Sequence, residues 1–232
     1  MEYSRGAPVW ARFVEPGQNP TVEAPRKGWI LPEGSTRLPP PPGTDSDCPL
    51  PYDWDRRNYA ALDVETTGLD AGKDRVIEIG IVQFSIDPEG AILEIARWGS
   101  LINPGIPIPA SATAIHGIED FDVWMSPGFA EVASHVAKLV EGRVMVAHNA
   151  PFDAAFINAE FARLGLPSPF GEIADSLGIL RAGYPTLLSY SLGKAAFVLG
   201  IDRGTSHRAL DDAATCMRIF VQSARKMTGA CP

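Results

Sequence analysis

Asp63 and Glu65 are two acids placed two positions apart at the end of a short apolar run, residues 59–64. The run has the length and composition of a buried strand, along which side chains alternate, so both carboxylates point to the same side. Carboxylates among apolar neighbours repel each other unless a proton or a cation lies between them. Oxygen ligands of this kind suit Mg²⁺ or Mn²⁺. Taken alone, such a pair is more commonly two surface acids at a strand end.

A third acid, Asp153, follows a second short apolar run, residues 143–147. We expect that run to be a strand and residues 151–164 to be an amphipathic helix. Asn149 or its neighbour would cap this helix, and Pro151 would lie in its first turn. Asp153 then lies where the helix dipole favours a carboxylate in any protein, so its position alone does not require a catalytic role.

His207 and Asp212 lie five residues apart at the start of the longest expected helix, residues 206–226. We expect Thr205 or Ser206 to be its N-cap. An exposed histidine and a first-turn acid are also ordinary features of a helix start.

The remaining pattern from residue 58 onward predicts a packed α/β domain. Turn-rich segments at 70–74 and 87–90 separate apolar runs, which favours a meander of antiparallel strands. Besides the elements already named, we expect strands over residues 75–86 and 91–102, and helices over 127–139 and 189–199.

Composition sets limits on the class of protein. The chain is 45% hydrophobic and 21% charged, as is usual for a globular protein, and no apolar run reaches the ~20 residues of a membrane span. Three dispersed cysteines, Cys48, Cys216 and Cys231, suggest free thiols in a reducing cytoplasm. The net charge of −8 argues against nucleic acid as a partner, although bound divalent cations would bring positive charge of their own.

The first 57 residues differ from the rest, because they hold 11 of the 21 prolines. Proline fixes φ and donates no backbone hydrogen bond, so we expect an irregular, extended segment. Two interpretations remain open: a disordered tail, which the composition favours, or an arm that lies along the folded domain or on a partner. Large apolar residues favour the arm: Trp10, Phe13, Trp29, Ile30 and Leu31.

Together, the acidic segments resemble the three motifs of the DEDDh 3′→5′ exonucleases, a group that includes the epsilon proofreading subunit of bacterial replicative polymerase and ribonuclease T. The resemblance covers residues 58–226. It places Asp63 and Glu65 in the first motif, Asp153 in the second, and His207 with Asp212 in the third.

The details of the resemblance narrow the assignment. The family spacing selects Asp212 over the adjacent Asp211. The tyrosine branch of the superfamily would have Tyr at position 208, where this chain has Arg. Residues 102–104, 114–118 and 190–192 resemble weaker family features.

This resemblance implies a ribonuclease-H-like fold, with a mixed five-stranded sheet flanked by helices and an irregular proline-rich N-terminal extension. It implies an exonuclease domain over residues 58–228 that removes 5′-mononucleotides from the 3′ end of DNA or RNA. Asp63, Glu65, Asp153 and Asp212 would hold two divalent metal ions, Mg²⁺ or Mn²⁺, and His207 would be the general base. The residues that would contact substrate are Thr66, Thr67, Gly68, Leu69, His116, Asn149 and Phe152, with assistance from Arg208 and Lys194.

The sequence constrains the binding partners of the protein less than it constrains the fold. The expected partner is a nucleic-acid 3′ end, single-stranded DNA or RNA, and no membrane is expected. The chain ends a few residues after the last expected helix, without a polymerase-binding tail like that of epsilon, so polymerase association stays open. Monomer and homodimer are both open. The alternative function is an inactive nuclease-fold module, or an adaptor that docks through its proline-rich segment.

Overall fold

The structure, a computed structural model, describes residues 50–51, 53–204 and 207–229, together with three two-residue strands upstream. The strands are β1 (Arg12–Phe13), β2 (Trp29–Ile30), β3 (Ser35–Thr36), β4 (Tyr59–Thr66), β5 (Val76–Ile86), β6 (Ile92–Leu101), β7 (Val144–Ala147) and β8 (Ile173–Asp175). The helices are η1 (Trp54–Arg56), α1 (Ala110–His116), α2 (Asp120–Val123), α3 (Phe129–Val140), α4 (Ala150–Arg163), α5 (Ser176–Gly183), α6 (Leu192–Val198) and α7 (Ala209–Thr228).

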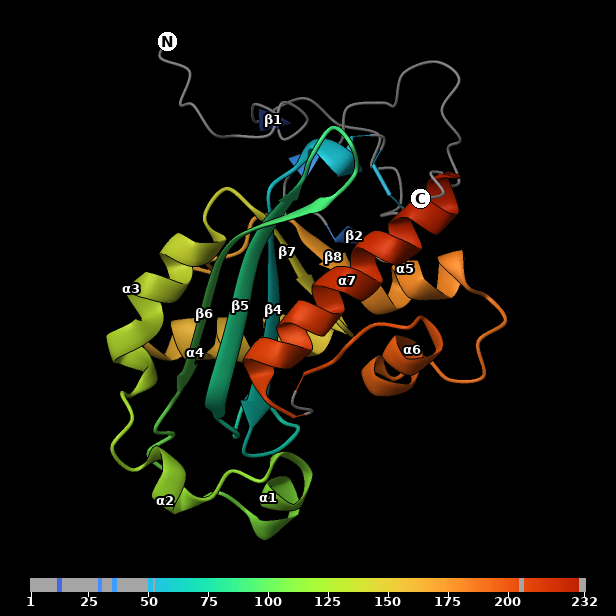
Figure 1. Cartoon of the computed structure of the whole chain (residues 1–232). Coiled ribbons are helices and arrows are strands. Elements are labelled where there is room, and N and C mark those ends of the chain that lie inside the picture. The colour runs from blue at the N-terminus through green and yellow to red at the C-terminus, as the bar shows by residue number, and fades with distance from the viewer. Residues whose placement is uncertain are drawn as a thin grey trace.

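A mixed sheet forms the centre of the molecule, in the order β2-β8-β7-β4-β5-β6 (Figure 1). β4, β5 and β6 form the antiparallel meander that the turn-rich segments predicted. β7 pairs parallel with β4, and β8 pairs parallel with β7. The predicted mixed five-stranded sheet is therefore confirmed as β4 to β8. The two-residue strand β2 adds to it by pairing antiparallel with β8.

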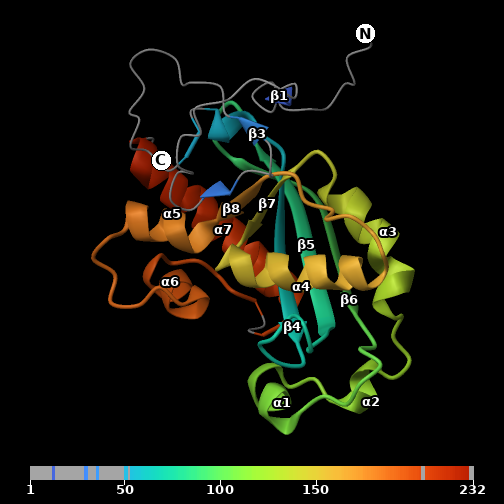
Figure 2. The same cartoon turned by 180° about the vertical axis from the view of Figure 1, so that it is seen from behind.

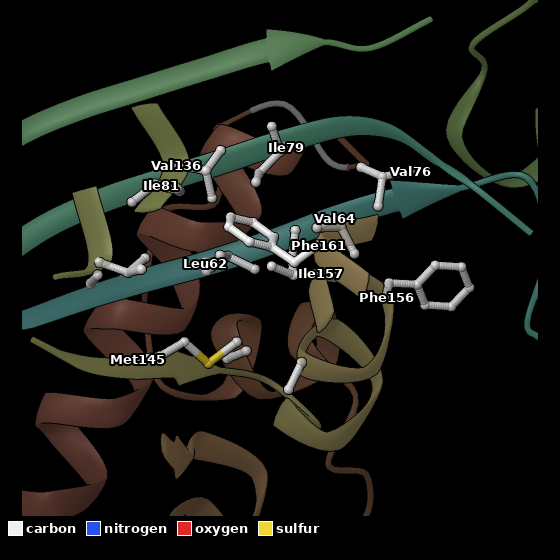
Figure 3. Close-up of a cluster of buried hydrophobic side chains, with 14 of the residues drawn as sticks. Leu62, Val64, Val76, Ile79, Ile81, Val136, Met145, Phe156, Ile157 and Phe161 are labelled. Atoms are coloured by element: carbon white, nitrogen blue, oxygen red, sulfur yellow. The ribbon is translucent and has the colours of Figure 1, made fainter. Parts of the chain in front are cut away.

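Helices cover both faces of this sheet. α7 crosses one face, and α4 lies across the other together with α3 (Figures 1 and 2). Side chains alternate along β4, so Leu62 and Val64 pack under α3 and α4, whereas Tyr59 packs under α7. Figure 3 shows the first of these cores, in which Ile157 and Phe161 of α4 lie beside Leu62 and Val64 of β4. Asp63 has the same parity as Tyr59 and therefore lies on the α7 face.

The second core reaches upstream of β4. Tyr59 stacks on Phe84 and contacts Phe220 of α7, while Trp54 meets Phe220 edge-on. Leu50 and Trp54 are buried in this core, although both precede residue 58. The boundary of the domain at residue 58 stays a prediction.

The expected helices and strands appear within a few residues of their predicted bounds, with one correction at α7. This helix begins at Ala209, and Arg208 is its N-cap, so neither Thr205 nor Ser206 caps it. Those two residues, most of the extension and the cysteines at positions 48 and 231 lie outside the described residues. The sequence analysis missed α1, α2, β8 and α5, because elements of three to eight residues carry too few positions for a periodic pattern.

None of the helices in the described part of the chain combines the length and apolarity needed to cross a membrane.

Candidate active site

Asp63 and Glu65 lie at the carboxyl end of β4, on the face that α7 covers. Both side chains are half-buried. Asp63 pairs across the sheet with Gly80 of β5, and Glu65 pairs with Glu78. The alternation of the strand thus gives the two carboxylates the common direction that the sequence predicted.

Asp153 is brought to β4 by the start of α4. Asn149 is the N-cap of this helix in a left-handed conformation (φ 77°), and Pro151 lies in the first turn. The buried Asp153 carboxylate accepts a hydrogen bond from the backbone N–H of Val64 (3.2 Å), which lies between Asp63 and Glu65. This hydrogen bond therefore attaches α4 directly to β4, the strand that carries Asp63 and Glu65.

Asp212 is brought to β4 by the first turn of α7. Its buried carboxylate accepts the backbone N–H of His207 (3.0 Å), and Arg203 Nη2 lies 3.5 Å from its Oδ1. His207 is exposed and has a left-handed backbone (φ 59°). The neighbouring Asp211 is half-buried and contacts the Gly204 turn, so Asp212 is the acid of the pair that faces β4.

Burial raises the pKa values of all four carboxylates, and repulsion between neighbouring acids adds to this at Asp63, Glu65 and Asp153. Burial, followed by repulsion from Asp153, Asp212 and Glu65, raises the pKa of Asp63 well above its usual range. Burial and the Asp212 charge raise the pKa of Glu65 to about 7, and burial raises that of Asp153 to about 8. The pKa of Asp212 is raised by burial, against a downward effect of the His207 N–H. Near neutral pH this cluster must hold either protons or cations.

The donor set fits a divalent metal. Glu65, His207 and Asp212 each offer a ligand atom, and these atoms lie within 4.8 Å of one another. Clustered carboxylate oxygens are the preferred ligands of hard divalent cations. A cation there would replace the protons that mutual repulsion otherwise retains.

The turn after β4 holds four predicted substrate contacts. The hydroxyl of Thr66 donates to the carbonyl of Gly68 (2.6 Å), and that of Thr67 interacts with the Asp74 carboxylate (3.3 Å). The Asp74 carboxylate also lies against Gly68, since a Cβ at Gly68 would be 2.4 Å from Asp74 Oδ2. Leu69 is 85% exposed at the tip of this turn.

The other predicted substrate contacts are more scattered. Phe152 lines the same cleft as the carboxylates. Asn149 is exposed, and its N–H donates to Asp175 (3.0 Å). His116 is buried at the end of α1, where its Nδ1 accepts the N–H of Ile118 (3.0 Å). Its Nε2 lies near the Thr66 backbone but has no partner at hydrogen-bonding geometry among the described residues, and burial lowers its pKa.

Several residues of the site were not found by sequence reasoning. Glu78 accepts two hydrogen bonds from Arg208 (3.0 and 2.8 Å) and one from the N–H of Ala209 (3.2 Å), which fixes the start of α7 on β5. Arg208, expected to assist with substrate, is thus engaged by Glu78. The alternation of residues 75–80 was visible in the sequence, but nothing local linked Glu78 to residue 208.

His148 is the second such residue, at the end of β7. Its Nε2 bonds the Tyr190 carbonyl (2.7 Å), and its Nδ1 bonds the hydroxyl of Ser176 (2.9 Å). Because a carbonyl only accepts, Nε2 carries the proton, and burial lowers the pKa of His148, which favours this neutral ring. His148 therefore attaches the loop before α6 to the sheet.

A cleft of about 960 Å³ joins these features. Its lining includes the four acids, His148, Phe152 and His207, and also residues 186–189 and 191–194, Phe197, Val198 and Arg203. The structure thus combines a ribonuclease-H-like fold with a cluster of four acids and an adjacent histidine that line one cleft.

Comparison with known proteins identifies the family to which the chain belongs. The RNase_T exonuclease family model matches residues 60–220, and the chain belongs to this family. Its class of activity is accordingly that of the 3′→5′ exonucleases. The chain is 38% identical over 176 residues to the DNA polymerase III subunit epsilon of Treponema pallidum, covering 73% of this chain and 80% of the relative. It is 32% identical over 169 residues to the 3′-5′ exonuclease DinG of Staphylococcus haemolyticus, of which it spans only 18%.

Solved structures support the fold. Escherichia coli exonuclease I in complex with a dT13 oligonucleotide superposes with a TM-score of 0.63 at 18% identity, over 75% of this chain and 43% of that one. Exonuclease X in complex with 5′ overhanging duplex DNA superposes with a TM-score of 0.56 at 24% identity, over 74% of this chain and 93% of that one. At these identities the likeness establishes the ribonuclease-H-like architecture alone.

Proposed function

We propose that this chain removes 5′-mononucleotides one at a time from the 3′ end of single-stranded DNA or RNA. The observation that carries the proposal is the convergence of Asp63, Glu65, Asp153 and Asp212 beside His207 at one end of an open cleft. Such a cluster is stable near neutral pH only with bound cations or protons. Cations at this position also offset the net charge of −8 where the phosphates approach.

The four carboxylates would hold two divalent cations, Mg²⁺ or Mn²⁺, which when bound supply Lewis acidity toward phosphate oxygens. His207 accepts the proton of the attacking water. The water oxygen bonds to phosphorus, and the bond to the 3′ oxygen of the preceding nucleotide breaks. That oxygen takes up a proton from solvent and stays on the shortened strand as its new 3′-hydroxyl. The released nucleotide carries the phosphate at its 5′ position.

The terminal nucleotide would lie between the turn after β4 and the start of α4. Exposed Leu69 would wedge against its base, and Phe152 lines the same cleft as Asp153. Thr66, Thr67 and Gly68 would contact the nucleotide through backbone groups. The hydroxyls of Thr66 and Thr67 already have partners within the turn, and the Asp74 carboxylate already lies against Gly68. His116 and Asn149 complete the proposed set of contacts.

An inactive binding module is the second candidate, and the intact set of acids argues against it. Docking through the proline-rich segment is compatible with activity, and so is association with a polymerase. Replacing Pro39, Pro40, Pro41 and Pro42 by alanine leaves the buried Leu50 and Trp54 in place and separates the two roles: docking should be lost while hydrolysis persists.

A digestion panel tests the proposal. The chain is incubated with Mg²⁺ or Mn²⁺ and 5′-labelled single-stranded DNA, RNA, or duplex DNA with a terminal mismatch. A ladder shortened from the 3′ end, with 5′-mononucleotides as product, is expected. Cleavage of a circular single strand, or activity that survives exhaustive chelation, would contradict it.

A further inference from the structure

The part of the cleft lining that comes from α6 and the loop before it, here called the α6 wall, is unusually apolar for a surface in contact with water. Leu188, in the loop before α6, is fully exposed, and Phe197 and Val198 of α6 are 85% and 61% exposed. All three line the cleft that contains Asp63 and Asp212. Large apolar side chains gathered in one cleft, continuous with reactive groups, are typical of a surface that a ligand covers.

Two cations line the same wall. Lys194 is exposed on α6 and forms no ion pair with any described residue. Arg203 lies against Gly193, where a Cβ would be 2.4 Å from Arg203 Nη1. Its Nε is buried without a partner among the described residues, and its only ion pair is the 3.5 Å contact with Asp212. The wall therefore combines an exposed aromatic ring with two positive charges, of which that of Lys194 has no ion-pair partner among the described residues.

A second apolar surface lies at the same end of the sheet, on α1 and α2 (Figures 1 and 2). Phe121, Trp124 and Met125 are 80%, 65% and 79% exposed there. Its charge is opposite, because residues 98–137 contain no Lys or Arg, and α2 carries carboxylates. A polyanion is attracted to the α6 wall and repelled by the α1–α2 surface.

We propose that the nucleic-acid strand upstream of the terminal nucleotide leaves the active site along α6. Phe197 is the platform on which a base stacks, and Lys194 and Arg203 face the phosphates. This inference rests on the proposed function and adds a direction and a set of contacts to it. Because every base has a stacking face, these contacts bind a strand without selecting its sequence.

Equilibrium binding to a fluorescein-labelled eight-residue oligothymidylate tests the path. The full chain is titrated by anisotropy with Ca²⁺ in place of Mg²⁺, and the oligonucleotide is checked for integrity on a gel. Phe197→Ala should weaken binding about fivefold to a hundredfold, the range for loss of one stacked base, whereas Phe197→Trp should bind like wild type. Lys194→Gln should reduce the slope of log Kd against log salt by about 0.7, the contribution of one phosphate of a single strand.

The matched controls are Phe121→Ala and Trp124→Ala on the α1–α2 surface, which should change neither Kd nor the salt slope. Phe197 is exposed, so its variants are expected to fold, and thermal unfolding verifies this. Wild-type affinity in Phe197→Ala, no affinity in the wild type, or a loss confined to the α1–α2 variants would each overturn the inference. Hydrolysis of the same oligonucleotide with Mg²⁺ is measured alongside. If the chain hydrolyses the oligonucleotide but Phe197→Ala binds it as tightly as wild type, only the proposed path is refuted. If binding depends on Phe197 but no hydrolysis occurs, only the exonuclease proposal is refuted.

Discussion

Gly80 of β5 lies directly against the first peptide of α7, where a Cβ would be 2.3 Å from the carbonyl carbon of Ala209. Gly80 is also the partner of Asp63 across the sheet. The missing side chain lets the helix that carries Asp212 begin in contact with the strand pair that carries Asp63. The close packing at Gly80 therefore lets Asp212, in the third motif, lie near Asp63, in the first motif.

Substitution of Gly80 by alanine should separate these elements. The obstacle is backbone rather than a flexible side chain, so relief requires α7 to shift. We expect the free energy of unfolding to fall by about 1–3 kcal/mol or more, as for an overpacked core, and activity to fall further than stability explains. Thermal unfolding and initial rates measure both. Gly171→Ala is the control, because a Cβ there meets nothing within 4 Å; equal behaviour of the two variants would refute this role of Gly80.

Metal binding should stabilise the folded chain through Asp63. At a concentration one hundred times its Kd, Mg²⁺ or Mn²⁺ should stabilise the wild type by about 2.7 kcal/mol. Asp63→Asn should lose most of this stabilisation and the activity. Without metal the variant should unfold at a higher temperature than the wild type, because a repelling carboxylate is gone. The control is Asp55→Asn, which changes an exposed acid before β4 and should behave as wild type in calorimetry with and without chelator. Stabilisation by metal that survives in Asp63→Asn would contradict the assignment of Asp63 as a metal ligand.

Stability without metal should decline as pH rises. The pKa of Glu65 is raised from 4.5 to about 7, and that of Asp153 from 3.8 to about 8. Between about pH 4 and pH 8 the folded state therefore binds more protons than the unfolded state, so the free energy of unfolding falls with pH across this window. Saturating Mg²⁺ should oppose the decline, so the difference in Tm between metal and chelator should grow from pH 5 to pH 8. A metal-free Tm that rises over this range would show that the carboxylates are not mutually repelling.

A 3′-terminal phosphate should inhibit hydrolysis. The site is proposed to receive a free 3′-terminal nucleotide, and the phosphate adds charge and bulk where the hydroxyl is expected. Oligonucleotides that differ only at the 3′ end, hydroxyl against phosphate, give the comparison, with a 5′ phosphate as control. Equal rates on all three would argue against recognition of the 3′ end.

Loss of the imidazole at residue 207 should slow the chemical step. His207→Ala should lower kcat by roughly 10²–10⁴-fold, the usual range for a general base. Metal affinity should change much less than in Asp63→Asn if the imidazole acts as base, although its ring lies near enough to Glu65 and Asp212 to be a ligand. Calorimetric titration with Mn²⁺ distinguishes the two roles, and His135→Ala on α3 is the control. Near-wild-type kcat under saturating metal would remove the base assignment.

The placement of the four acids was predictable because it follows from short-range patterns in the sequence. The parity of Asp63 and Glu65 follows from the two-residue repeat of a strand, and the positions of Asp153 and Asp212 follow from the first turn of a helix. The antiparallel meander was predictable for the same reason, since turn residues separate its strands. The spacing of His207 and Asp212 completed the family resemblance.

Contacts between distant segments were settled only by the tertiary structure. The pairing of Glu78 with Arg208, the close approach at Gly80 and the attachment of His148 to Tyr190 join residues 42 to 130 positions apart. No local periodicity encodes such pairs, because they depend on how helices pack across the sheet. The exposed ring of Phe197 illustrates the same limit: its sequence context is that of an ordinary helix, and only the fold places it on the wall of the cleft that holds the acids.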